Sequence, residues 1–140
     1  MRYSKDRLKN KTGNILSRKY RLRRPSDFKK VYQSKQWGAS EHYTFNVLAN
    51  TLNNEDCSRL GVTVSKKVAK QAVVRNRIKR QIKEFYRCHS EALQSSDLVI
   101  TAKPSCARVT DIDRLQSLEQ LWIKVIKWQR WYLANNATQS

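Results

Sequence analysis

The stretch VVRNRIKRQIKEFYR, residues 73–87, places an apolar residue at every third or fourth position among six basic side chains and a single acid, Glu84. This spacing is the period of an α-helix, and it predicts a helix over roughly residues 72–89. One side of that helix is apolar enough to face a protein core. The predicted core-facing stripe is Val74, Ile78, Ile82, Phe85 and His89.

The opposite side of the same helix is a continuous basic face about five turns long, because successive residues are 100° apart. A helix face that is merely solvated carries both signs of charge, spaced to pair. Here only Arg80 and Glu84 have that spacing, and Arg77 falls off the face, near Gln81 and Glu84. We interpret the face as a surface for a polyanion. Its members are Arg75, Asn76, Lys79, Arg80, Lys83 and Arg87.

The whole chain shares this imbalance of charge. Its 140 residues include 29 Lys and Arg against 11 Asp and Glu, which gives a formal charge of +18 and a pI near 10.3. This length suits one compact domain, and this charge favours nucleic acid as the partner. An anionic membrane is the alternative. No apolar run approaches the length of a membrane-spanning helix, and the amino terminus lacks the apolar segment of a signal peptide. We therefore expect a cytoplasmic protein that does not bind a membrane.

The first part of the chain predicts an arm followed by a helix. Residues 1–24 carry ten Lys and Arg against one Asp with no sustained apolar period, so we expect residues 1–20 to form a mobile basic arm. Pro25 and the residues after it then predict a short amphipathic helix, since Phe28 and Tyr32 share one side of it.

Three strands are expected around the basic helix. HYTFNVLA, residues 42–49, and RLGVTVSKK, residues 59–67, alternate apolar and polar residues, and the polar turn 51–58 between them predicts a hairpin. Gly61 indicates a bulge or a close approach of another group to the backbone. SDLVITAKP, residues 96–104, is the third strand and ends at its proline.

A long helix over residues 111–130 closes the chain. Thr110 and Asp113 have the spacing of a capping box, and a frayed tail is expected over residues 132–140. The predicted fold is α+β, a small two-layer sandwich of one domain over residues 21–131, with helices packed on a mixed sheet in the order α-β-β-α-β-α. The expected buried stripe of the last helix is Leu115, Leu118, Trp122, Val125 and Ile126.

The side chains for independent catalysis are missing. The chain has no phosphate-binding GxxxxGK[ST] loop and no GxSxG motif, and its carboxylates are scattered. Asp111 and Asp113 are better explained as helix caps than as metal ligands. No zinc set or catalytic pair is predicted among the remaining candidates, which are Cys57, Cys88, Cys106, His42 and His89.

RNRIKR at residues 75–80, preceded by RLGVTVSKK and followed by EFYR, resembles the signature of the bacterial ribonuclease P protein component. The similarity covers roughly residues 20–130 in order. RLRRPSDFKKVY resembles the first helix of that family, HYTFNVLA its first long strand, SDLVITAKP its later strand and SLEQLWIKVIKW its closing helix.

The resemblance implies a function that composition alone does not. In that family a catalytic RNA cleaves precursor tRNA with Mg²⁺, and the protein binds the RNA and the 5′ leader of the substrate. The expected partners are therefore the catalytic RNA subunit and precursor tRNA, without a small-molecule substrate. The family fold also includes a left-handed crossover through the RNR helix, which is uncommon among parallel strands.

Carried over by position, the resemblance also implies site residues, none of them catalytic. The loop VAKQAV, residues 68–73, departs from many relatives in lacking a glycine, and the first 20 residues align with nothing in the family. The implied RNA-binding residues are Lys66, Lys67, Arg75, Asn76, Arg77, Lys79, Arg80 and Lys83, which Arg87 joins as a member of the basic face. The implied leader-binding cleft consists of Phe28, Tyr32, Thr44 and Asn46.

Two alternatives share the charge of this chain. A ribosomal or other structural RNA-binding protein would not need a leader cleft. A metal-dependent nuclease acting without RNA would need clustered carboxylates, which the sequence does not provide.

Overall fold

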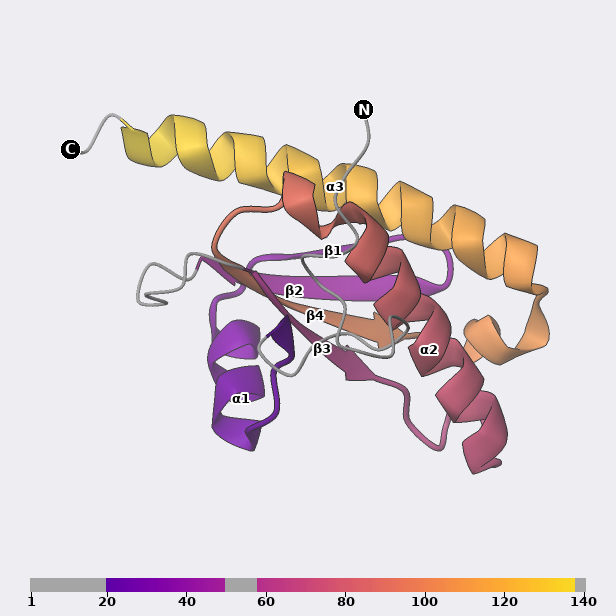
Figure 1. The fold of residues 1–140 in the computed structure, drawn as a ribbon. Helices are drawn as coiled ribbons and strands as arrows, with labels where there is room; N and C mark the ends of the chain where they lie inside the picture. Colours follow the sequence, from indigo (N-terminus) through magenta and orange to yellow (C-terminus); the bar gives the residue numbers. More distant parts are fainter. Residues whose placement is uncertain (1–19, 50–57, 138–140) are drawn as a thin grey trace, which may run out of the picture.

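The computed structural model describes residues 20–49 and 58–137 (Figure 1). The expected arm over residues 1–20 and the turn over residues 51–58 therefore lie almost wholly outside the described residues. In chain order the elements are α1 (Pro25–Gln33), β1 (Trp37–Ala39), β2 (Tyr43–Ala49), β3 (Arg59–Thr63), α2 (Ala72–His89), the short 3₁₀ turn η3 (Ser90–Ala92), β4 (Ser96–Ala102), the 3₁₀ turn η4 (Pro104–Arg108) and α3 (Asp111–Ala137).

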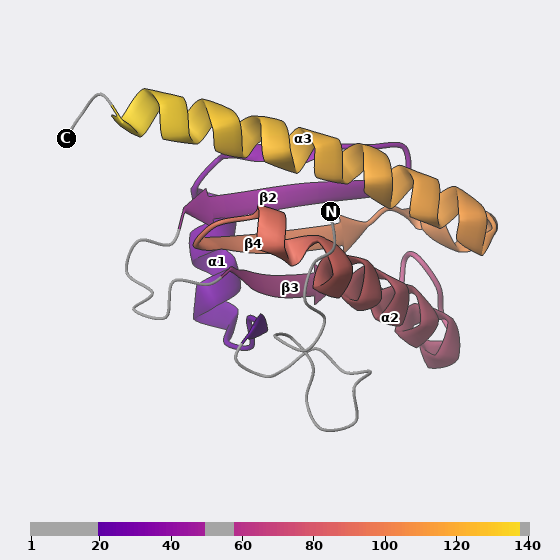
Figure 2. The ribbon, with the colours of Figure 1, turned by 45° about the horizontal axis from the view of Figure 1, so that its top comes forward.

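The strands form a mixed sheet in the order β1-β2-β4-β3. β4 lies antiparallel to β2 and parallel to β3, and α2 makes the crossover between the two parallel strands (Figure 2). The predicted hairpin between β2 and β3 is therefore wrong. Six of the seven residues of β4 are buried, so both faces of this strand must be covered. It accordingly lies in the centre of the sheet, between β2 and β3.

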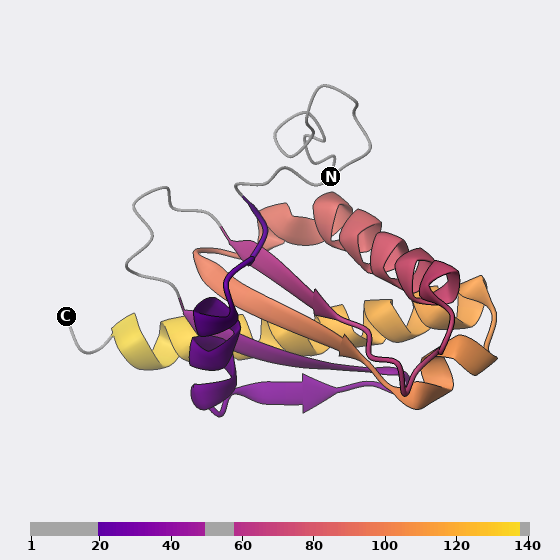
Figure 3. The same cartoon turned by 90° about the horizontal axis from the view of Figure 1, so that it is seen from below.

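Helices cover both faces of the sheet. Seen from below, α1 lies in front of the sheet and α3 behind it (Figure 3). The larger core, on the side of α2 and α3, includes Tyr43, Phe45 and Val47 from alternate positions of β2. A smaller core under α1 contains Leu22, Val31 and Val99, with Phe28 and Leu48 packed against it. None of the helices in the described ranges is long and apolar enough to cross a membrane.

The core stripe predicted for α2 is confirmed at its centre, since Ile78 and Ile82 are fully buried and Phe85 nearly so. Its two ends, Val74 and His89, are half-buried. The stripe of α3 is shifted from its prediction. Leu118, Trp122 and Val125 are buried as expected, but Leu115 is 41% exposed, and Leu121 takes a core position instead.

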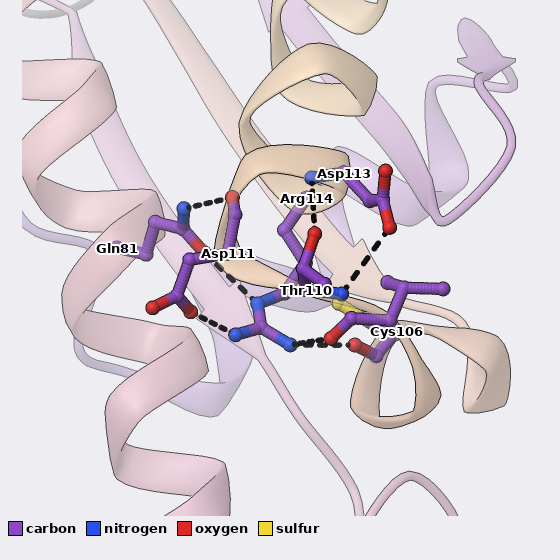
Figure 4. A network of polar contacts seen from close by, with 7 residues as sticks. Gln81, Cys106, Thr110, Asp111, Asp113 and Arg114 are labelled. Atoms are coloured by element: carbon purple, nitrogen blue, oxygen red, sulfur yellow. Dashed lines mark hydrogen bonds and ion pairs between the residues drawn. The ribbon is translucent and has the colours of Figure 1, made fainter.

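The start of α3 confirms the predicted capping box. The Asp113 backbone N–H donates to Thr110 Oγ1 at 3.1 Å, and the Thr110 N–H donates to Asp113 Oδ2 at 3.3 Å (Figure 4). The helix then continues to Ala137, seven residues beyond its predicted end at residue 130, so residues expected in a frayed tail are helical.

Candidate functional site

The basic side chains of α2 lie on the side of the helix that faces away from the sheet. Ile78 and Ile82 fix the helix to the sheet, which leaves Asn76, Arg77 and Arg80 exposed. Arg75, Lys79 and Lys83 are half-buried at one flank. An open hollow of about 1180 Å³ runs along this helix and reaches the start of α3. In the described part of the chain, no ion pair involves Arg77, Lys79, Arg80 or Lys83.

The single acid of α2 pairs with a residue other than the one expected. Glu84 forms an ion pair with Arg87, and Arg80 is not its partner. Arg87 is only 4% exposed, so its predicted place on the solvent-facing basic face is wrong. A helical-wheel projection gives only the direction in which each side chain leaves the helix. It does not predict that the Arg87 side chain folds back along the helix to contact Glu84, which is half exposed. Arg80 consequently forms no ion pair with any carboxylate in the described ranges.

The loop that enters α2 presents further cations. Lys66 and Lys67 are exposed in a turn closed by the Val68 N–H, which donates to the Ser65 carbonyl at 3.0 Å. Arg75 holds the rest of the loop, because its guanidinium donates to the Ala69 and Lys70 carbonyls at 2.9 and 2.7 Å. These two hydrogen bonds stabilise a loop that contains no glycine. Arg75 therefore has a structural task as well as a charge.

A second basic cluster joins α2 to the segment before α1. Arg21 forms a β-bridge with Leu60 at the outer edge of β3, and the Leu22 N–H donates to the Leu60 carbonyl at 2.8 Å. This places Arg21 beside Lys83. Partial burial lowers the pKa of Lys83, and the nearby charges of Arg21 and Lys79 lower it further. A bound anion would relieve this repulsion.

Polar contacts tie the other flank of α2 to α3. Arg114 is buried, and its guanidinium donates to Gln81 Oε1 at 3.1 Å and to the Cys106 carbonyl at 3.0 Å (Figure 4). It also pairs with Asp111, whose carbonyl accepts from Gln81 Nε2 at 2.9 Å. These contacts fix the orientation of the basic helix. Asp111, which was predicted to cap α3, thus contributes an ion pair to this network.

The sheet face beside α1 forms a second polar surface, assembled from all four strands. Strand register places Ala39, Thr44, Thr101 and Thr63 in one row across the sheet. The next row contains Trp37, Asn46, Val99 and Gly61. Residues directly opposite one another share a face, so both rows face the side on which α1 packs.

Helix α1 covers the β3 end of the second row. A Cβ at Gly61 would lie 2.6 Å from Phe28 Cε2, so the glycine provides the room that the ring occupies and confirms the predicted close approach. Phe28 is accordingly half-buried, as part of the small core. Tyr32 is 42% exposed, and its hydroxyl lies 3.5 Å from Thr63 Oγ1.

The structure brings the four residues of the predicted leader cleft to this one face. Thr44 and Asn46 are half-buried on β2, with the ring of Tyr32 over the neighbouring part of the sheet. Sequence reasoning missed Trp37, Thr63 and Thr101. β1 has only three residues, and two of the threonines become neighbours only through the pairing of β3 with β4.

The described residues contain no catalytic constellation. No group of three or more His, Cys, Asp and Glu side chains could hold a metal ion in these ranges. His42 is buried with Nδ1 2.8 Å from Ser105 Oγ, and His89 stacks on Phe85. Burial raises the pKa of the Cys106 thiol, which keeps it neutral, and Cys57 lies outside the described residues.

Comparison with known proteins identifies relatives along most of the chain. The family model described as "Ribonuclease P" matches residues 16–126. The ribonuclease P protein component of Sodalis glossinidius is 40% identical over 105 residues, which cover 75% of this chain and 86% of that protein. That of Nitrosococcus oceani is 35% identical over 111 residues, covering 79% and 91% of the two chains.

Solved structures show the same fold. The Staphylococcus aureus RNase P protein superposes with a TM-score of 0.71 at 29% identity, over 76% of this chain and 94% of that one. The RNase P protein from Thermotoga maritima, determined in complex with 1-(4-fluorophenyl)-2-thiourea, has a TM-score of 0.62 at 24% identity, which supports the fold alone.

Proposed function

The chain belongs to the bacterial ribonuclease P protein component family, and on that premise we propose that it binds RNA through two surfaces with different tasks. As the protein subunit of this endoribonuclease, it acts with an RNA subunit in the 5′ processing of precursor tRNA. The proposal concerns how the two surfaces divide that work. We also propose that the protein is located in the cytoplasm, where precursor tRNA is made.

The first surface binds phosphates of the RNA subunit. It consists of the exposed cations of α2 with Lys66 and Lys67 in the loop before it. The start of α2 has no acidic residue in its first turn and no side-chain cap, so its backbone N–H groups add to the positive potential. Phosphate contacts of this kind supply affinity and orientation, independent of base sequence. Arg87, being buried, is left out of this surface.

The second surface holds the single-stranded 5′ leader. Single-stranded RNA is commonly bound by aromatic faces next to a basic groove, with polar groups at the base edges. Tyr32 offers an exposed ring, while Thr44 and Asn46 offer hydroxyl and amide groups from the adjacent strand. Phe28 supports α1 from below, since its ring packs against Gly61. The observation that carries the proposal is this meeting of an exposed aromatic with a polar sheet face.

Catalysis is assigned to the RNA. Asp113 caps α3, Asp97 is paired with Arg59, and no cluster of carboxylates in the described ranges offers the several oxygen ligands that Mg²⁺ needs. We assign the Mg²⁺ of the holoenzyme to the RNA for this reason. The part of the protein is to position the RNA and its substrate.

A Tyr32→Ala holoenzyme tests the leader surface. We expect binding of leader-bearing precursor tRNA to weaken by about 1 kcal/mol or more, with little change for mature tRNA, because one stacked base is lost. Tyr32→Phe, which keeps the ring, should bind like the parent protein. The free protein should lose less stability than the roughly 3–5 kcal/mol of a core aromatic truncation.

The same assay contains the controls for the whole proposal. Protein without the RNA subunit should leave precursor tRNA intact in Mg²⁺, since it lacks clustered metal ligands. Equal losses for precursor and mature tRNA would show that Tyr32 does not contact the leader. Cleavage without RNA that survives further purification would overturn the assignment of catalysis.

A further inference from the structure

Trp37 is the most exposed aromatic side chain among the described residues, with 67% of its surface open. A single exposed apolar residue is ordinary on a protein surface. What distinguishes Trp37 is its register, because it lies directly opposite Asn46. Cβ atoms of such a pair are about 5 Å apart and point to the same face. The indole therefore belongs to the polar sheet face described above.

The backbone that carries Trp37 is firmly held, although β1 is a short edge strand. The Gln36 carbonyl accepts the Val47 N–H at 3.0 Å, and Gln36 Oε1 accepts the indole N–H of Trp128 at 2.7 Å. At the other end of β1, Lys124 Nζ donates to the Ala39 carbonyl. Both ends of the strand are thus tied to α3. A ring on such a support is pre-organised for binding, because its position needs little further ordering.

Tyr32 and Trp37 stand at opposite sides of the polar face. The Tyr32 hydroxyl reaches Thr63 on β3, whereas Trp37 is on β1, and the sheet order separates these strands by three spacings. At about 4.8 Å per spacing, the distance across is about 14 Å. A stacked strand rises about 3.4 Å per nucleotide, so about four nucleotides or fewer connect the two rings. Between them lie Thr101, Thr44 and Asn46.

We propose that Trp37 is a second base-stacking position for the single-stranded 5′ leader, at the β1 edge of the face whose other aromatic is Tyr32. The inference rests on the proposed function. The occupant is RNA because the chain carries a formal charge of +18, which draws a polyanion to its surface. The leader runs across the strands, from one ring to the other, and Trp37 extends the contact to a nucleotide that Tyr32 does not reach.

The test uses holoenzyme and a set of precursor tRNAs, each with one abasic nucleotide in the leader, under conditions that do not support cleavage. With the intact leader, Trp37→Ala should weaken binding about five- to tenfold, within the range for one stacked base. Trp37→Phe should retain most of the affinity. Trp131→Ala is the matched control, because Trp131 is also an exposed tryptophan, 52% open, but lies on α3. It should change nothing.

The abasic set distinguishes failure of this inference from failure of the leader surface. One leader position should lose its abasic penalty in Trp37→Ala, and a different position should lose it in Tyr32→Ala. If only the Tyr32 position responds, Trp37 is not a stacking site and the proposed function stands. If mature tRNA is weakened equally by Trp37→Ala, Trp37 does not contact the leader and this inference falls alone. If neither leader position responds, the leader surface and this extension fall together.

Discussion

The outer side of α2 and the sheet face beside α1 are both proposed RNA-binding surfaces, yet they are built in opposite ways. Four cations of α2, Arg77, Lys79, Arg80 and Lys83, come from seven consecutive residues of one helix. The sheet face combines one or two residues from α1 and from each of the four strands. The first surface is a local pattern of charge, and the second exists only once the sheet has formed.

The two surfaces also differ in what fixes their side chains. Arg77, Lys79, Arg80 and Lys83 lack carboxylate partners in the described part of the chain, and long charged side chains adapt to phosphates over a range of positions. Tyr32, Asn46 and Trp37 are placed by helix packing and strand register. The difference teaches that the basic surface should tolerate changes in packing but respond to charge and salt. The sheet face should behave in the opposite way.

The strongest test of this contrast replaces Arg77, Lys79 and Arg80 with glutamine. Loss of three phosphate contacts should reduce the steepness of the plot of log affinity for the RNA subunit against log salt concentration, changing its slope by about 2. At 0.1 M salt this corresponds to about 100-fold weaker binding. Arg75 is left unchanged because it holds the loop before α2. A salt titration of binding measures both quantities.

The matched control for that variant removes the same number of charges elsewhere. Arg108, Lys127 and Arg130 are exposed near or on α3. Their replacement by glutamine should leave the slope nearly unchanged. Equal effects in the two triple variants would mean that net charge, and not the face of α2, governs RNA binding.

Gly61→Ala should affect the other surface. The added Cβ would meet the ring of Phe28 at 2.6 Å, and overpacking of this kind costs about 1–3 kcal/mol of unfolding free energy. Displacement of Phe28 moves α1 and the ring of Tyr32 with it, so the preference for precursor over mature tRNA should shrink. The salt slope should stay as in the parent protein. Chemical denaturation and paired binding assays measure the two effects.

A second substitution establishes the cause. With Phe28→Leu in place, Gly61→Ala should cost less than it does alone, because the smaller side chain leaves room for the new methyl group. Additive losses in the double variant would show that the ring is not the obstacle. A changed salt slope would show that the two surfaces are coupled.

The smallest effect is expected for Lys83→Met. Lys83 is charged beside Arg21 and Lys79, and burial with this repulsion lowers its pKa in the folded state. The unfolded chain therefore holds the proton more tightly, and the unfolding free energy should rise as pH increases from the folded pKa of Lys83 toward its unfolded value. Lys83→Met should remove that rise and stabilise the free protein slightly at neutral pH. RNA affinity should fall about fivefold, as one phosphate contact is lost at 0.1 M salt.

Thermal unfolding across alkaline pH, with and without RNA, checks this prediction. A variant that is less stable than the parent at neutral pH would show that the methylenes of Lys83 matter more than its charge. Unchanged RNA affinity would place the contact of α2 with RNA further toward Arg77 and Arg80.

The local features of this chain were predictable from its sequence. The stripe Ile78, Ile82 and Phe85 follows from a period of 3.6, and the bonds between Thr110 and Asp113 follow from spacing alone. Both depend on residues within a few turns of one another. For the same reason the cations of α2 could be identified before any fold was known, except Arg87, which turns back onto Glu84.

Features that depend on distant residues were not predictable from pattern. The alternation in β2 and β3 is the same whether the strands pair or are separated, so it could not place β4 between them. Trp37 was overlooked because three residues are too few to display a period. Leu115 repeats at helical spacing with the core residues of α3, but Arg114 and Ser117 occupy the buried positions nearby.

The insertion of β4 between β2 and β3 has a consequence for how the protein is made. β4 supplies the pairing partner of both earlier strands, yet it is the last strand to leave the ribosome. A nascent chain that ends before residue 96 holds β2 and β3 with no shared partner. The sheet therefore closes only after β4 has been synthesised, through contacts between residues far apart in the chain, which are the slow ones to form.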